Sequence, residues 1–294
     1  MLADSHLHVG GEVKGRTLLS YMDGAGLERA MLLGSSLFTL TLDHRDGFVN
    51  HSENNTHLLR LGRSHPDRLG AWPTLDPREP QNSWRVRSYA EQGATGIKLY
   101  VGHGACNAFT GEPIFHVCRI DDDCMLPIYE TCAKLHLPIC LHVNCGRAAY
   151  WSELLRVLYR YHDLKLVIPH FALSTRAPDR LRFLLERFPN VLTDTSFGQD
   201  EFLLAGSIRV GQSAELRELV SAYSERFLFA TDLVLTDAAH KTPQWMADRV
   251  EHYRSMLTAE QYWSKAFQRT FRGLALPSSA SHSIMCANLD TLCA

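Results

Sequence analysis

The amino-acid sequence predicts an α/β fold, namely a single (β/α)8 TIM barrel with a C-terminal helix and an irregular tail. Eight short apolar segments alternate along the chain with amphipathic segments or long loops, which predicts right-handed βαβ units and a parallel sheet. Several of these segments are apolar throughout, as is typical of parallel strands covered by helices. The segment HVGGEVKG after the first strand lacks the Gly-x-Gly-x-x-Gly motif, which disfavours the alternative, a doubly wound sheet.

The predicted strands are short, and eight of them in a chain of 294 residues suit a closed barrel. They lie at residues 2–9, 29–36, 68–75, 94–100, 137–143, 164–171, 190–196 and 226–233.

Amphipathic patterns predict helices between these strands. In the segment PDRLRFLLERFP, for example, Leu181, Leu184, Leu185 and Phe188 form one apolar stripe. The predicted helices lie at residues 82–93, 125–136, 150–162, 178–189, 213–226 and 242–257, with a weaker pattern at 13–26.

The last segment, residues 276–294, has lost this periodicity and is rich in Ser, Ala and Cys. We therefore expect a barrel domain at residues 1–275 and a disordered or loosely packed tail at 276–294. Deletion of 278–294 is expected to leave the fold and the activity intact.

Composition narrows the function class. A formal net charge of −2 gives no electrostatic case for nucleic acid or anionic membranes. No segment approaches the ~18 consecutive apolar residues of a membrane span, and no signal-peptide pattern is present at the N-terminus. The eight cysteines do not have the spacing of a disulfide scaffold, so reduced thiols in the cytoplasm are expected.

Ionisable residues recur where the predicted strands end, which is the active-site face of a barrel. In the first strand Asp4, His6 and His8 alternate and share one face. Each such residue in an apolar run costs several kcal/mol of desolvation unless it is paired or metal-bound. The alternatives are a polar edge strand at the N-terminus and separately hydrogen-bonded core histidines. They must be invoked again for each of Lys98, His142, His170 and Asp232.

The ordered set Asp4-x-His6-x-His8, Lys98, His142, His170 and Asp232, on predicted strands one, four, five, six and eight, resembles the amidohydrolase superfamily. The early first motif is similar to its amidohydrolase-related branch, which includes aromatic-acid decarboxylases, lactone hydrolases and amide hydrolases. The resemblance covers roughly residues 2–275. Residues 264–274 resemble the closing helix of that branch, with Lys265-Ala266 where Asn-Ala is more usual.

The resemblance implies that His6, His8, His142 and Asp232 bind a divalent metal ion. It also implies that Asp232 takes a proton from the attacking water, and that His170 ligates a second metal or orients the reacting group. Asp4 is expected to fix a histidine tautomer from outside the ligand set. Imidazole and carboxylate ligands favour zinc, with manganese as the alternative. One ion is favoured over two, as in most of that branch.

Lys98 is costly to bury as an ammonium, and three interpretations stay open. Its amine could be carboxylated and bridge two metals, as matching lysines are in some branches. It could remain an ammonium that pairs with a substrate carboxylate or with Asp232. It could also point outward with its head in water.

The sequence therefore predicts a metal-dependent hydrolase that uses a metal-activated water on an amide, ester or lactone of a small molecule. A metal-dependent lyase on the same scaffold, a non-oxidative decarboxylase or a hydratase, is the alternative. A non-catalytic barrel is disfavoured because the whole residue set is present. Substrate contacts are expected from loops 101–124, 197–212 and 234–241. The sequence leaves open whether the chain forms a homo-oligomer.

Overall fold

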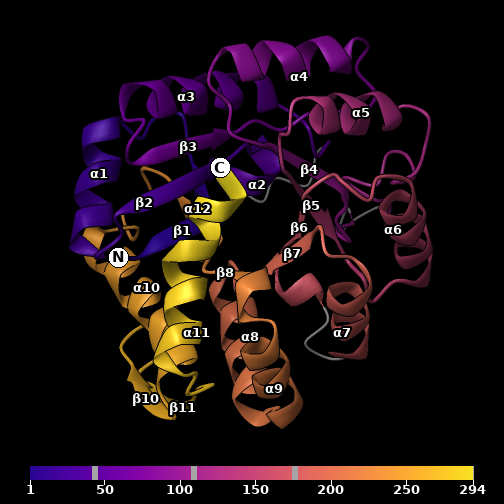
Figure 1. Ribbon diagram of the computed structural model, residues 1–294. Helices are drawn as coiled ribbons and strands as arrows, with labels where there is room; N and C mark the ends of the chain where they lie inside the picture. Colours follow the sequence, from indigo (N-terminus) through magenta and orange to yellow (C-terminus); the bar gives the residue numbers. More distant parts are fainter. Residues whose placement is uncertain (42–45, 107–110, 174–177, 294) are drawn as a thin grey trace.

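The computed structural model describes residues 1–41, 46–106, 111–173 and 178–293 (Figure 1). Nine strands in two sheets form a parallel ring. One sheet has the order β3-β2-β1-β9 and the other the order β4-β5-β6-β7-β8. The strands are β1 (Ala3–Val9), β2 (Arg29–Leu33), β3 (Leu69–Trp72), β4 (Ile97–Gly102), β5 (Ile139–Val143), β6 (Leu166–Ile168), β7 (Val191–Asp194), β8 (Phe227–Leu228) and β9 (Leu233–Leu235).

Backbone contacts join the two sheets at both seams. At one seam a parallel bridge pairs Thr74 with Lys98, whose amide donates to Pro73 O at 2.9 Å. At the other seam Ser5 N donates to Phe229 O at 2.9 Å. This arrangement confirms the predicted barrel class. The eighth predicted strand, at 226–233, contains β8, and β9 begins at its last residue.

Helices cover the outside of the ring, and each predicted helix is present with shifted ends. They are α1 (Gly15–Gly24), α2 (Leu37–Thr41), α3 (His51–Ser64), α4 (Asn82–Glu91), α5 (Leu126–Lys134), α6 (Ala148–Arg160), α7 (Pro178–Arg187), α8 (Asp200–Gln212), α9 (Ala214–Ala222) and α10 (Pro243–Thr258), with 3-10 turns at Phe171–Leu173 and Ser224–Arg226. Residues 197–212, expected as a loop, are mostly the helix α8. Among the described residues no helix is long and apolar enough to cross a membrane.

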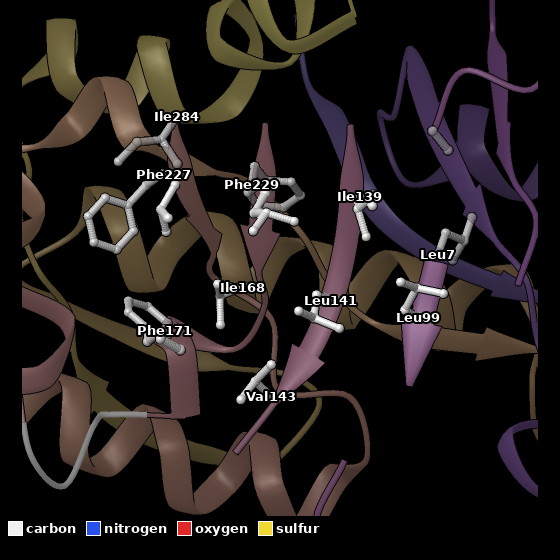
Figure 2. Packing of buried hydrophobic residues seen from close by; sticks show 14 of the residues in the cluster. Leu7, Leu99, Ile139, Leu141, Val143, Ile168, Phe171, Phe227, Phe229 and Ile284 are labelled. Carbon is white, nitrogen blue, oxygen red and sulfur yellow. The ribbon is translucent and has the colours of Figure 1, made fainter. Parts of the chain in front are cut away.

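Strand alternation decides which side chains face the interior of the ring. On β5 the residues Ile139, Leu141 and Val143 join the main apolar cluster of strands and helices (Figure 2), whereas Cys140 packs in a different cluster. The same alternation sends Lys98 to the inside of the ring, because its neighbours Ile97 and Leu99 belong to the main cluster. Lys98 is fully buried, which excludes the outward orientation that the sequence left open.

The tail differs from the expectation of disorder or loose packing. It forms α11 (Ser278–His282), a π-helical turn at Ser283–Ala287 and α12 (Asn288–Cys293). In Figure 1 these yellow segments cross the barrel beside β1 and β8. Leu289 and Leu292 are buried in a cluster with Met31 and Trp72 from the strands. The tail therefore covers the amino-terminal end of the ring. The π turn interrupts the 3.6-residue period, so the sequence showed no amphipathic pattern.

Residues 264–274, expected as a closing helix, instead form a hairpin of β10 (Gln261–Ser264) and β11 (Arg269–Arg272). Tyr262 and Phe271 pair across the hairpin and are buried, whereas Trp263 is 59% exposed. This alternation with period two suits a strand. Gln268 in the turn has a φ of 48°, a conformation that a helix cannot continue through.

Candidate metal centre

The predicted site residues from distant parts of the sequence meet at the carboxyl end of the barrel. His6 and His8 lie on β1, and Asp232 lies just before β9, which pairs with β1. One ligand atom from each of these residues lies within 4.8 Å of those of the other two. His6, His8 and Asp232 thus form a group that could hold a metal ion.

Hydrogen bonds fix the tautomers of both β1 histidines. His6 Nδ1 lies 2.8 Å from Asp194 Oδ2. His8 Nδ1 lies 3.0 Å from the carbonyl oxygen of Leu33, which can only accept, and 2.9 Å from Ser35 Oγ. Each Nδ1 therefore carries the hydrogen, and each Nε2 presents a lone pair. This pattern is typical of metal-binding histidines.

The two Nε2 atoms both face the same carboxylate oxygen. His6 Nε2 and His8 Nε2 each lie 3.1 Å from Asp232 Oδ1. Burial and the nearby Lys98 lower the pKa of His6 to about 4, so no proton lies between His6 Nε2 and Asp232 Oδ1 at neutral pH. Three electron-pair donors around one point repel each other unless a cation lies between them. The donor set fits a divalent transition metal.

Asp194, at the end of β7, was not predicted and connects the histidines of two strands. Besides His6 Nδ1, its carboxylate accepts from His170 N at 2.8 Å and from Ser196 Oγ at 2.6 Å. Ser196 Oγ also lies 2.8 Å from His170 Nδ1. Burial alone would raise the pKa of the Asp194 carboxyl, but the hydrogen bond from His6 and the nearby imidazoles hold that pKa well below its usual range. Asp194 therefore orients both rings as an ionised carboxylate.

His170 follows β6 in an unusual left-handed turn. The residues from His170 to Leu173 all have φ between 51° and 63°, although none is glycine. The His170–Asp194 bond and a bond from Ala172 N to Thr193 Oγ1 hold this turn. It brings His170 Nε2 to 4.0 Å from Asp232 Oδ2. Strain of this kind is often found at functional sites.

Asp232 offers its two oxygens to different neighbours. Oδ1 faces His6 and His8, whereas Oδ2 faces His170 and closely approaches Gly198, where an added Cβ would lie 2.4 Å from Oδ2. Burial raises the pKa of this carboxyl, but the three histidines outweigh it and lower the pKa well below the usual range. Asp232 is therefore ionised at neutral pH.

His142 and Lys98 flank this group. The His142 ring centroid lies 4.6 Å from that of His170 and 4.0 Å from that of His103. His142 does not join His6, His8 and Asp232 in the group of converging ligand atoms among the described residues. Lys98 Nζ lies 3.2 Å from His6 Nε2 and 4.8 Å from the ring centre of Tyr100.

Asp4 has a different place from the one expected. Its carboxylate accepts from the backbone amides of His6, at 2.9 Å, and Thr231, at 3.1 Å, and from the Thr231 hydroxyl at 2.6 Å. The carboxylate that reaches a histidine ring from outside the group is that of Asp194. Asp4 therefore stabilises the backbone between β1 and the segment that leads to Asp232. Burial raises the pKa of Asp4 to about 7.

A cavity of about 920 Å³ opens above the group and includes His8, His142, His170 and Asp232 in its wall. Aromatic and polar side chains from β4, from the loops and from α2, α7 and α8 line much of the rest, among them Phe38, Tyr100, His103, Phe115, Asn144, Arg180, Phe197, Phe202 and Arg209. The sequence did not single out Asp194, His103 or Asn144 as site residues. Their place at the ends of predicted strands was the available signal.

Comparisons with known proteins agree with this architecture. The model of a family described as Amidohydrolase matches residues 4–273. A probable 2-pyrone-4,6-dicarboxylic acid hydrolase from Acinetobacter baumannii has a similar structure (TM-score 0.64, 13% identity, 99% of this chain and 98% of that chain covered). So does 4-oxalomesaconate hydratase from Rhodopseudomonas palustris (TM-score 0.60, 17% identity, 99% of this chain and 95% of that chain covered). A third similar structure is that of 2,6-dihydroxybenzoate decarboxylase from Rhizobium (TM-score 0.56, 14% identity, 99% of this chain and 98% of that chain covered). A search of curated proteins found no match.

Proposed function

The chain belongs to the amidohydrolase family whose model it matches, and from this premise we propose that it is a metal-dependent hydrolase of an amide, ester or lactone of a small molecule. The observation that carries the proposal is the convergence of His6 Nε2, His8 Nε2 and Asp232 Oδ1, each with a lone pair turned to the same point. Such a group binds a cation, and its position at the carboxyl end of the barrel is where enzymes of this fold react.

His6, His8 and Asp232 would hold the ion, and His142 is proposed as a further ligand at the edge of the group. Zinc suits these ligands, and manganese is the alternative, since a structure similar to this chain was obtained in complex with manganese. One ion is proposed rather than two, with Lys98 unmodified. A divalent ion here supplies an activated water and a polarised carbonyl oxygen.

The chain's own residues would move the proton. Asp232 Oδ2 is turned away from the β1 histidines and is proposed to take the proton from the attacking water and to pass it to the leaving group. His170 Nε2, 4.0 Å from that oxygen, is proposed to orient the reacting group. Its ring is held for this role by Ser196 and by the backbone bond to Asp194.

The cavity wall suits a small organic substrate. Phe38, Phe115 and Phe197 provide apolar surface that excludes water, and Arg180 and Arg209 provide positive charge. We also propose a cytoplasmic location, because the seven cysteines whose side chains are described are all free thiols.

A lyase is the second candidate, because the similar structures include a hydratase and a decarboxylase as well as a probable 2-pyrone-4,6-dicarboxylic acid hydrolase. The metal group and Asp232 would serve either reaction. Product chemistry separates the two, since hydrolysis cleaves a C–O or C–N bond with water, decarboxylation releases carbon dioxide and hydration adds water to a double bond.

The test is a screen of zinc-loaded and manganese-loaded protein against small lactones, esters, amides and aromatic acids, with products identified by mass spectrometry in ¹⁸O-labelled water. We expect a cleaved product that carries one ¹⁸O atom, and loss of turnover after chelation. Release of carbon dioxide, or addition of water without cleavage, would assign the lyase reaction instead. Full turnover after complete removal of metal would refute both.

A further inference from the structure

One wall of the cavity carries two hydrogen-bond donors whose orientation the backbone fixes. His103 follows β4, and Asn144 follows β5, so the two residues lie on neighbouring loops at the carboxyl end of the barrel. Both line the cavity. Neither takes part in the proposed metal group or proton transfer.

The backbone determines which nitrogen of His103 carries a hydrogen. The amide of Ala105 donates to His103 Nδ1 at 2.9 Å, so Nδ1 is an acceptor and the hydrogen of the neutral ring is on Nε2. The ring is held in place against His142, at 4.0 Å between centroids, and against Phe115, at 5.1 Å. In the described part of the chain no group accepts a hydrogen bond from Nε2–H.

A backbone amide also determines the orientation of the Asn144 side chain. The amide of Gly146 donates to Asn144 Oδ1 at 3.1 Å, so the oxygen end of the side chain is occupied, and within the described residues the NH₂ end is the free donor. This NH₂ group lies against Gly104, where an added Cβ would be 2.9 Å from Nδ2. Because Gly104 directly follows His103, the two donors come from the same part of the wall.

The charge of the cavity indicates the kind of acceptor. Among the residues that the structure describes, the charged side chains in its lining are the cations Arg180 and Arg209 and the carboxylate of Asp232, which already faces three histidines. A substrate group that only accepts hydrogen bonds and carries negative charge is complementary to such a wall.

We propose that His103 and Asn144 form a donor subsite of the cavity that binds a carboxylate of the substrate. The term substrate rests on the proposed function, but the binding property does not. The subsite would position a carboxylated molecule with its reacting carbonyl toward Asp232. His103 and Asn144 are thus specificity-determining residues.

The experiment measures binding of benzoate and of uncharged benzyl alcohol to the purified full chain by calorimetry, with and without zinc. His103→Phe keeps an aromatic ring beside His142 but removes the donor. Asn144→Asp replaces the donor by a carboxylate of the same shape. We expect wild type to prefer benzoate and each variant to bind benzoate about tenfold or more weakly, with little change for benzyl alcohol. His103→Gln, which restores an N–H donor, should recover part of the affinity.

Two variants serve as controls. His162→Phe changes a histidine that is 77% exposed, and Gln92→Glu adds a negative charge at an exposed helix end. Neither should alter benzoate binding. Unchanged benzoate affinity in both His103→Phe and Asn144→Asp, or a wild type that does not prefer benzoate, would overturn the subsite.

A second measurement needs only the wild-type fold. In ¹⁵N spectra of histidine-labelled protein, assigned with His103→Gln, the neutral His103 ring should carry its hydrogen on Nε2. A hydrogen on Nδ1 would contradict the proposal. Binding and the tautomer are both measured without turnover. The donor subsite can therefore be tested even if the proposed enzymatic reaction is not found.

Discussion

Asp194 shows how strongly the site depends on one side chain outside the ligand group. It is almost fully buried, and it contacts His6 through the ring and His170 through the backbone. The hydrogen bond to Nδ1 sets the His6 tautomer and increases the electron density at Nε2.

We therefore expect Asp194→Asn to weaken zinc binding about 10- to 100-fold, because an amide is a poorer acceptor for the His6 Nδ1 hydrogen. Competition with a chelator of known zinc affinity measures this change. Asp163→Asn is the matched control, since Asp163 is 88% exposed. An Asp194→Asn protein with wild-type zinc affinity would show that Asp194 does not support the metal ligand.

Asp232→Asn should lower turnover more than metal occupancy. The amide oxygen can still contact a cation weakly, but the amide cannot carry the proton, and such groups contribute roughly 10²–10⁴-fold to the rate. The measurement is kcat at saturating zinc, with occupancy determined by elemental analysis of the same sample. Wild-type kcat in a fully loaded variant would refute the proton-transfer role.

At this scale the sequence predicted residue types and their face of the barrel, but not hydrogen-bond partners. His6, His8 and Asp232 could be predicted because each is an ionisable group in an apolar strand region. Asp194 lies in the more polar segment NVLTDTS, where an aspartate among polar neighbours does not indicate a functional site. Asp4 was expected to contact a histidine ring, but its carboxylate binds the backbone amides of His6 and Thr231 and the Thr231 hydroxyl. Residue 231 is so far from residue 4 in the chain that the sequence alone does not reveal this contact.

At the scale of elements, the C-terminal segment behaves as part of the barrel. Asn288 donates to the backbone of Ser224 and Phe227, both at 2.7 Å, and Phe229 N donates to Ile284 O at 2.8 Å. These bonds fix the tail against β8. The sequence could not predict them, because a short helix with a π turn has no regular apolar stripe.

Leu289→Ala should therefore destabilise the protein by about 2–5 kcal/mol, the usual cost of truncating a buried leucine. Leu289 is 2% exposed, whereas Leu135, the matched control for Leu135→Ala, is 40% exposed. Urea unfolding measures both. Equal stabilities of the two variants would indicate a loosely attached tail.

Deletion of 278–294 should likewise destabilise the fold, contrary to the expectation from the sequence.

The hairpin β10–β11 is attached to the helices through His252 of α10. His252 Nε2 lies 2.8 Å from Ser207 Oγ of α8, and Nδ1 lies 2.9 Å from Ser264 Oγ of β10. Burial, with a smaller contribution from Arg249, lowers the pKa of His252 from 6.5 to about 4. The folded state therefore favours the neutral form of the His252 ring.

Because the unfolded chain takes up a proton at His252 below about pH 6.5 and the folded chain does not, stability from this group falls as the pH drops toward 4. Between pH 7 and pH 5 the loss is about 2 kcal/mol. The free energy of unfolding of wild type and His252→Gln, measured at both pH values, isolates this contribution. Wild type should lose more stability than the variant, and equal losses would contradict the lowered pKa.

At the scale of the whole molecule, the barrel brings together residues that are far apart in the chain. Its parallel strands were predictable because several of them are buried on both faces and therefore apolar throughout. The rule that strand carboxyl ends share one face then predicted the location of the site. The substrate and the reaction depend on a few atoms in the loops, which the strand pattern does not determine.

The central claim is that His6, His8 and Asp232 hold one divalent ion. Calorimetric titration of chelator-treated protein with zinc tests it most directly, with wild type compared to His8→Ala. We predict saturation at one ion per chain in wild type, and binding weakened by at least about tenfold in His8→Ala. Absence of zinc binding in wild type, or equal affinity in the two proteins, would contradict the claim. Saturation at two ions with dependence on bicarbonate would instead make Lys98 and His170 ligands of a second metal.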